Sequence, residues 1–384
     1  MNLTDPHSVR ILPIVEKFNI TGEIATVTAF GNGHINDTFL LKNLYPENPD
    51  YLLQRINHHV FKDVPGLIGN IDRVTAYLKS KMAAGFDNKK SGQVLKLVPS
   101  KDQQLFYKDD EGNYWRIYIF VAGSRSYDSV ATPQQAFEGG KAFGSFQALL
   151  SDMDPSLLSE TIADFHNIQK RLADFDLAVE KDLMHLAATI ETEIKFIRAR
   201  ERPMSVINDL GRSGLLPMRV THNDTKFNNI LFDENDQIAC VIDLDTVMAG
   251  YVAYDFGDAI RTIVNTAAED EPDLEKIQID IPLFEAYLQG YIQEANCFLT
   301  ATEIESLYLG AVLLPYMQGV RFLTDYLQGD RYFKVAYPGH NLVRAKAQFR
   351  LLQKLEEQGQ LLCDMISRAA ADYKSIYKEA QFGR

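Results

Sequence analysis

The sequence predicts an α+β chain, with a small antiparallel-sheet domain carrying one helix followed by a larger, mostly helical domain. The first observation is the length of 384 residues, which is more typical of two domains than of one. The second is a first third rich in short β-branched and aromatic runs, separated by turn residues. The third is that long segments with apolar residues at helical spacing follow. We expect domains at residues 1–121 and 122–384.

The first domain is expected to be a sheet interrupted by a single helix. The helix is predicted at residues 64–82, because Leu67, Ile71, Val74 and Leu78 recur at helical spacing. Strands are predicted at residues 24–30, 38–41, 51–56, 93–98 and 114–121. The first two strands form a hairpin whose connection contains Gly31 and Gly33, and glycine permits unusual backbone angles.

The second domain is expected to be helical apart from one strand-rich island at residues 219–244. Pro133 suits the first turn of a helix, since proline has a fixed φ and needs no amide donor there. Periodic apolar residues predict helices at residues 133–150, 173–199, 284–296, 302–327 and 341–373.

The composition narrows the classes of function. The net charge is −13, so we expect neither nucleic acid nor an anionic membrane surface as a partner. Three widely spaced cysteines give no disulfide framework, which favours the reducing cytoplasm. The start of the chain does not read as a signal peptide, and the most apolar run, residues 307–316, is about half the ~20 residues that a membrane helix needs.

The strand-rich island carries the pattern with the clearest chemistry. His222, Asp224, Lys226 and Asn229 are followed by an apolar strand that ends in Asp243, with Asp245 two residues later. Kinases use this order of residues in a catalytic loop and in the metal-binding acid after it. The other interpretation is an ordinary hairpin in which Asp and Asn only form turns.

Each of these residue types suits phosphoryl transfer. Asp224 suits a base that orients an acceptor hydroxyl and takes its proton, and Lys226 supplies a cation beside the transferring group. Mg²⁺ prefers oxygen ligands and keeps several waters, so Asn229 and Asp243, with Asp245 as a second acid, suffice to hold it.

With these segments in view, the chain resembles the aminoglycoside phosphotransferase and choline kinase-like superfamily. The similarity extends over blocks in order along the chain: residues 31–38, 221–231, 242–246, 255–258, 321–330 and 337–344. It implies a protein-kinase-like two-lobe fold and an ATP-dependent, Mg²⁺-requiring small-molecule kinase. The similarity is greatest to members that phosphorylate the anomeric hydroxyl of N-acetylhexosamines.

The resemblance also implies roles for single residues. Asp224 would be the base for the anomeric hydroxyl. The sugar would be held by His34 and Asn36 from the first domain and by Arg321 and Tyr332 from the second. Apart from the resemblance, the loop with Gly31 and Gly33 could let backbone amides approach ATP phosphates or the sugar, and the alternative is a plain hairpin turn.

One position departs from the kinase pattern. Gln54 stands where kinases have a lysine on the third strand, with Asp72 as the candidate helix acid. Because side chains alternate along a strand, Gln54 and Arg55 lie on opposite faces and only one of them can contact the nucleotide.

Alternatives remain open at this point. Choline, homoserine or an aminoglycoside are other acceptors, and the Gln54 departure also fits a non-catalytic nucleotide-binding protein. For single residues, His222 is expected to brace the loop rather than bind a metal, and Asp255 to accept bonds from loop amides or to cap a helix. Without the resemblance, Arg321 would be expected to pair with Asp325 one helical turn later.

Overall fold

The computed structural model describes residues 6–31, 35–85 and 92–382. The chain forms two compact units, which are considered separately. The sheet unit comprises Met1–Arg125, Ser156–Ala163 and Leu231–Met248, and the helical unit comprises Ser126–Pro155, Asp164–Ile230 and Ala249–Arg384. The expected division into domains at residues 1–121 and 122–384 stays a prediction.

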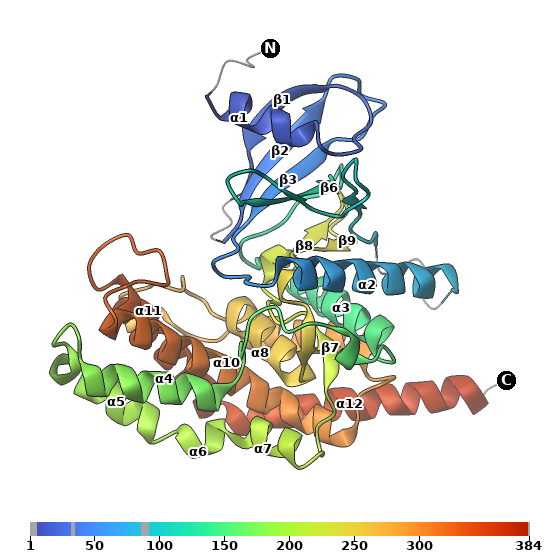
Figure 1. Cartoon of the computed structure of the whole chain (residues 1–384). Helices are drawn as coiled ribbons and strands as arrows, with labels where there is room; N and C mark the ends of the chain where they lie inside the picture. The colour runs from blue at the N-terminus through green and yellow to red at the C-terminus, as the bar shows by residue number, and fades with distance from the viewer. Residues whose placement is uncertain (1–5, 32–34, 86–91, 383–384) are drawn as a thin grey trace. The chain divides into compact units, whose positions relative to one another are not determined.

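The sheet unit is an antiparallel sheet in the order β1-β2-β3-β6-β4, with β5 also pairing to β6 (Figure 1). Its strands are β1 (Ile24–Ala29), β2 (Asp37–Asn43), β3 (Tyr51–Ile56), β4 (Leu97–Val98), β5 (Tyr107–Lys108) and β6 (Tyr114–Ile119). Its helices are α1 (Pro6–Val15) and α2 (Val64–Ala83). The small hairpin β8 (Ile230–Phe232) and β9 (Ile238–Val241) follows later in the chain.

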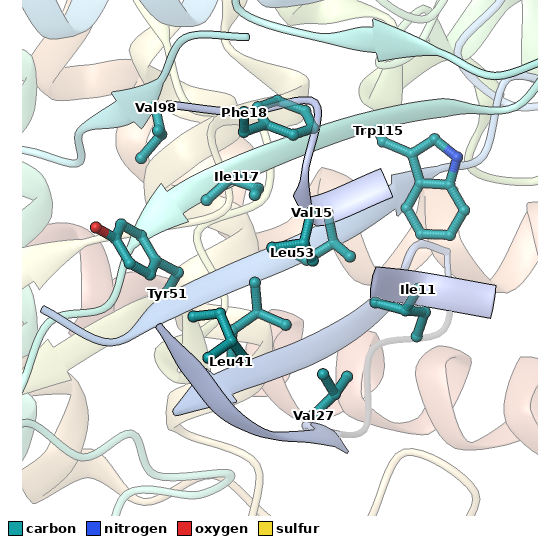
Figure 2. Packing of buried hydrophobic residues seen from close by; sticks show 11 residues of the cluster. Ile11, Val15, Phe18, Val27, Leu41, Tyr51, Leu53, Val98, Trp115 and Ile117 are labelled. Carbon is teal, nitrogen blue, oxygen red and sulfur yellow. The ribbon is translucent and has the colours of Figure 1, made fainter. Parts of the chain in front are cut away.

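One face of the sheet is closed by an apolar core (Figure 2). Ile11 and Val15 of α1 pack with Leu41 and Leu53 of the strands, all of them almost fully buried. Burial of such side chains contributes about 1.5–3 kcal/mol each. Because side chains alternate along a strand, polar residues of the same strands face the opposite side of the sheet.

Most expected elements of this unit are confirmed, with small shifts at their ends. The expected strand at 93–98 is wrong for its first half: only Leu97–Val98 joins β6, while Gln93 makes a single bridge to Cys240. The helix α1 was not expected, because ten residues are too short a window for a clear period.

The helical unit is mainly helices and includes the paired strands β7 (Arg219–Thr221) and β10 (Met248–Gly250), the latter except for its first residue. Its helices are α3 (Pro133–Leu150), α4 (Ile168–Lys181), α5 (Glu191–Arg198), α6 (Glu201–Met204), α7 (Val206–Arg212), α8 (Val252–Ile263), α9 (Ile281–Ala295), α10 (Ala301–Leu327), α11 (His340–Glu357) and α12 (Gly359–Phe382). Single 3₁₀ turns complete the chain at Pro155–Leu157, Ala187–Ile190, Phe227–Asn229, Leu244–Thr246 and Leu274–Lys276.

Two of the expected helices are wrong in length, because each is broken. The expected helix at 173–199 ends at Lys181, where Asp182 adopts a left-handed φ of 37° and its carboxylate accepts from the amides of Leu186 and Ala187. The expected helix at 341–373 divides at Gln358 into α11 and α12. Apolar spacing continues through both breaks, which is why periodicity alone did not find them.

The fold class is confirmed: the chain is α+β, with an antiparallel-sheet unit and a larger helical unit. Within the described residues, none of the helices combines the length and apolarity that crossing a membrane requires.

Candidate active site

The segment 221–231 is the candidate catalytic loop, and a buried carboxylate fixes its start. Asp255 on α8 is 1% exposed and accepts from the amides of His222 and Asn223 at 2.9 and 2.7 Å. Gln147 on α3 donates to the same carboxylate at 2.7 Å. Burial raises the pKa of Asp255 above its usual value despite these bonds. The expectation that Asp255 accepts from loop amides is confirmed, and the cap of α8 is Tyr251 instead.

His222 braces the loop from the inside, as expected. Its side chain is fully buried, and its ring meets those of Phe143 and Phe146 edge-on. The amide of Asp224 donates to its Nδ1 at 3.3 Å. These contacts leave the ring surrounded by aromatic side chains and backbone.

Three predicted residues come together at the end of this loop. Lys226 Nζ lies 2.9 Å from Asp224 Oδ1, and Asn229 Nδ2 donates to the Asp224 carbonyl at 2.8 Å and to its Oδ2 at 3.1 Å. Both bonds from Asn229 use its amide nitrogen, so the amide oxygen is the atom available to a cation.

The charge on Asp224 is stabilised by its neighbours. Burial by itself raises the pKa of a carboxyl group, but the Lys226 ammonium and its hydrogen bond hold the pKa of Asp224 below its usual value. Asp224 in turn raises the pKa of Lys226. Asp224 is therefore an ionised carboxylate at neutral pH, the state that a proton acceptor requires.

A residue that was not predicted supports the other side of the loop. His166 is 9% exposed and its Nε2 donates to the Asn223 carbonyl at 3.0 Å. Burial lowers the pKa of His166 to about 4, so the ring is neutral at pH 7. No spacing rule connects positions 166 and 223, so the sequence carried no signal for this contact.

Arg321 and Tyr332, both predicted to hold the sugar, also lie together in the helical unit. The Arg321 guanidinium lies over the rings of Phe165, Tyr332 and Phe333, at 5.3, 5.9 and 5.4 Å from their centres. Its hydrogen-bond partner is Gln318, at 3.0 Å. The alternative in which Arg321 pairs with Asp325 is wrong, because Asp325 is used elsewhere.

Asp325 fixes the loop that carries Tyr332. Its carboxylate is 3% exposed and accepts from the amides of Arg331, Tyr332 and Phe333 at 2.9, 2.8 and 2.9 Å. Asn341 of α11 adds a fourth bond at 3.0 Å. The loop conformation is therefore defined by one buried anion.

In the sheet unit, a polar row crosses three strands on the face opposite the core. Thr38, Gln54 and Arg116 are register partners on β2, β3 and β6. Gln54 donates to Thr38 Oγ1 at 3.0 Å and accepts from Arg116 Nε at 2.9 Å. Arg55 points to the other face, where it pairs with Asp37, so the predicted alternation is confirmed.

Arg116 forms a buried ion pair with Asp245. Its Nη1 lies 2.5 Å from Asp245 Oδ1, its Nη2 donates to Oδ2 at 2.9 Å, and the two side chains are 1% and 3% exposed. Burial opposes the charge on Arg116, but Asp245 raises its pKa. The sequence offered a signal here, since an arginine within the apolar strand Tyr114–Ile119 needs a partner.

The predicted N-terminal site residues divide into those the structure describes and those outside it. Asn36 donates to Asp245 Oδ2 at 2.7 Å and accepts from the Asn57 amide at 3.0 Å, so both ends of its side chain are engaged within the unit. Gly31 has a φ of 73°, which favours glycine. Gly33 and His34 lie outside the described residues.

Asp243 follows β9 and opens a tight turn. Its φ is 58°, in the left-handed region, and the 3₁₀ turn Leu244–Thr246 begins directly after it. Beyond that turn, Asn70 of α2 donates to the Val247 carbonyl at 2.9 Å. Asn70 is a buried polar residue of α2, whereas the candidate helix acid Asp72 is exposed.

The implied Mg²⁺ can be compared with the donors at hand. Among the described residues, no three His, Cys, Asp or Glu side chains gather closely enough to hold a metal alone. Asn229 and Asp243 offer the amide and carboxylate oxygens that Mg²⁺ takes together with water and phosphate oxygens. A guanidinium contacts both carboxylate oxygens of Asp245.

Comparison with known families gives one match that covers most of the chain. The model of the phosphotransferase enzyme family matches residues 26–293. This span includes Asp224, Asn229, Asp243 and Asp245.

Solved structures share the fold at low sequence identity. An aminopropanol kinase associated with a microcompartment has a TM-score of 0.59 at 15% identity, over 92% of this chain and 98% of that one. An amicoumacin kinase in complex with AMP-PNP and Ca²⁺ has a TM-score of 0.57 at 14% identity, over 90% and 93%. A choline kinase from Cryptosporidium parvum has a TM-score of 0.56 at 16% identity, over 94% and 99%.

Proposed function

We propose, from the premise that the chain belongs to the phosphotransferase enzyme family, that it is an N-acetylhexosamine 1-kinase. It would transfer the γ-phosphoryl group of ATP to the anomeric hydroxyl of N-acetylglucosamine or N-acetylgalactosamine. The observation that carries the proposal is Asp224, an ionised carboxylate bonded to Lys226 and Asn229 at the end of a braced loop. The solved kinases of similar fold support the reaction class.

In this proposal Asp224 accepts the proton of the anomeric hydroxyl as its oxygen attacks the γ-phosphorus. A bond forms between that oxygen and the γ-phosphorus, the bond from the γ-phosphorus to the β,γ-bridging oxygen breaks, and ADP leaves. Lys226 offsets negative charge beside the acceptor. Such general-base assistance contributes about 10²–10⁴-fold to rate.

Mg²⁺ bound with ATP would neutralise charge on the phosphate oxygens. Asn229 and Asp243 would hold it through side-chain oxygens. Gly31, Gly33 and Gln54 are proposed to lie on the nucleotide side of the site.

The charge around Arg321 supports a neutral or oxygen-rich acceptor. Burial and the neighbouring Arg321 guanidinium together lower the pKa of Arg171 to about 10, so two cations share this region. Choline and aminoglycosides carry positive charge and would be repelled there. Arg321 and Tyr332 are therefore proposed to bind hydroxyl and acetamido oxygens of a hexosamine. His34 is proposed as a further sugar contact, whereas the side chain of Asn36 is engaged with Asp245 and the Asn57 amide.

The test of this assignment is Asp224→Asn, with turnover followed as ADP release. The amide preserves the shape of the carboxylate but takes no proton, so turnover is expected to fall by about 10²–10⁴-fold. The melting temperature is expected to stay within a few degrees of the wild type. Asp209→Asn, an exposed surface carboxylate paired with Arg212, is the matched control and should retain full turnover. Near wild-type turnover in Asp224→Asn would remove the basis of the proposal.

A further inference from the structure

We infer that Asp245 is the counter-ion of Arg116 rather than a metal ligand, and that this pair positions the turn carrying Asp243. The inference rests on the proposed function in one respect, the assignment of Asp243 to the metal. It replaces the motif-based expectation that Asp245 is a second acid for Mg²⁺.

The geometry leaves Asp245 little capacity for a cation. Arg116 contacts both carboxylate oxygens, at 2.5 Å and 2.9 Å, and Asn36 donates to Oδ2 at 2.7 Å. The residue is 2% exposed. A metal ion at these oxygens would lie beside a guanidinium that is itself buried, and two cations sharing one carboxylate in a medium of low dielectric repel each other strongly.

The turn after Asp243 is fixed at two further points. Asn36 connects Asp245 to the start of β2 and, through the Asn57 amide, to the end of β3. Asn70 of α2 binds the Val247 carbonyl at 2.9 Å and the Ser159 carbonyl at 2.7 Å. Residues 245 and 247 are thus tied to the sheet and to α2, and the left-handed backbone of Asp243 lies directly before them.

The same network explains why this sheet can lack a lysine on its third strand. Gln54 stands at that place, and its amide oxygen accepts from Arg116 Nε at 2.9 Å. In this chain the buried cation lies on β6, whereas the kinase pattern has it on the third strand. Its carboxylate partner lies in the turn after Asp243, whereas the kinase pattern has it on a helix. The ion pair therefore acts on the position of Asp243 and is itself shielded from solvent.

A double-mutant cycle over Arg116→Met and Asp245→Asn tests the inference. The first readout is the melting temperature without ligand. The second is the Mg²⁺ concentration that gives half of the ATP-induced thermal shift, which needs no acceptor and no turnover. Arg116→Lys is a milder variant that keeps the positive charge if Arg116→Met fails to fold.

Each single substitution leaves one buried charge or acceptor without its partner, so each is expected to lower the melting temperature. The double variant removes both members and is expected to melt above the less stable single variant. Because both residues position Asp243, each single variant should raise the half-saturating Mg²⁺ concentration by about tenfold, corresponding to about 1.4 kcal/mol. Arg116→Lys should raise it less than Arg116→Met does.

A matched control comes from a bidentate ion pair in the helical unit, Arg200 with Glu356 at 2.9 to 3.2 Å. Arg200→Met should lower the melting temperature without changing the half-saturating Mg²⁺ concentration. The inference is overturned if Asp245→Asn weakens Mg²⁺ binding while Arg116→Met does not. It is also overturned if the variants change the melting temperature but leave the half-saturating Mg²⁺ concentration unchanged, since the pair would then have only a structural role.

Failure of the proposed function gives a different result. A wild-type protein with no ATP-induced shift at any Mg²⁺ concentration contradicts the phosphotransferase assignment. The melting-temperature cycle still decides in that case whether Asp245 is the counter-ion of Arg116.

Discussion

Among single residues, one buried carboxylate in each unit fixes the backbone beside a candidate site residue. Asp255 receives the amides at the start of the candidate catalytic loop, and Asp245 receives Arg116 beside the turn that carries Asp243. Neither is proposed to touch the reacting atoms. Each fixes the backbone next to a residue with a proposed role in the reaction, Asp224 in one case and Asp243 in the other.

The histidine beneath the candidate loop predicts a pH dependence of stability. The pKa of His166 is lowered by burial to about 4, against about 6.5 for a histidine in an unfolded chain. The folded state therefore favours the neutral ring. Above pH 6.5 the ring is neutral in both states, so His166 does not lower the free energy of unfolding there. As the pH falls from 6.5 to 4, the unfolded state binds the proton first and stability declines, by up to about 3 kcal/mol.

His166→Gln tests this sign, because glutamine can still donate to the Asn223 carbonyl. The variant should match the wild type near pH 8 and melt at a higher temperature than the wild type near pH 5. The exposed His59, changed to Gln, is the control and should follow the wild-type curve. Melting curves of His166→Gln and wild type that run parallel from pH 8 to pH 5 would contradict the prediction.

Residues within one local pattern were predictable, and residues joined only by the fold were not. Asp224, Lys226 and Asn229 are close in sequence, so their spacing already implied that they meet. Arg116 and Asp245 are 129 positions apart, and no spacing rule connects them. The arginine within an apolar strand was a usable signal that a partner exists, without saying which residue it is.

At the scale of elements, the loop after α10 shows how backbone is fixed for a side chain. The Asp325 carboxylate accepts four hydrogen bonds, three of them from consecutive backbone amides of the loop. Bonds to a charged acceptor contribute about 1.5–3 kcal/mol each, so the loop should depend on this carboxylate. The loop in turn places Tyr332 and Phe333 against Arg321.

Asp325→Ala is expected to raise the KM for the acceptor by about tenfold or more, since the loss of several such bonds exceeds the 1.4 kcal/mol that a tenfold change represents. The KM for ATP should be unchanged. Asp330→Asn is the control in the same loop. Asp330 accepts from the Asn341 side chain, and an asparagine oxygen can still accept that bond, so the acceptor KM should stay at the wild-type value. Steady-state kinetics with each substrate varied separately checks both. An unchanged acceptor KM in Asp325→Ala would show that this loop does not bind the acceptor.

Element boundaries were less predictable than element types. Periodicity located α2, α3, α9 and α10 to within a few residues, because their apolar residues face one side over several turns. It did not detect the break at Asp182, where α4 ends and one carboxylate accepts from two backbone amides. Such capping depends on which carboxylate finds which amide, and composition does not determine that.

For the whole molecule, the charge of −13 stands beside the proposal that it binds ATP. Some of the acids form ion pairs within the fold, Asp245 with Arg116, Glu303 with Arg219, and Asp258 with Arg261, and these pairs add nothing to the net charge. The proposed metal would bring further positive charge to the phosphates. The acidic composition is therefore compatible with an anionic nucleotide, and it predicts that turnover depends on a divalent ion.

The assignment as an N-acetylhexosamine 1-kinase is tested by ADP release over a panel of acceptors, with the phosphorylated position identified by ³¹P NMR. The panel holds N-acetylglucosamine, N-acetylgalactosamine, choline, homoserine and an aminoglycoside, each with Mg²⁺ and with EDTA. We predict turnover with the two N-acetylhexosamines, a product phosphorylated at the anomeric oxygen, and no turnover in EDTA. Turnover with choline but with neither hexosamine, or ATP binding without turnover on any acceptor, would contradict this assignment.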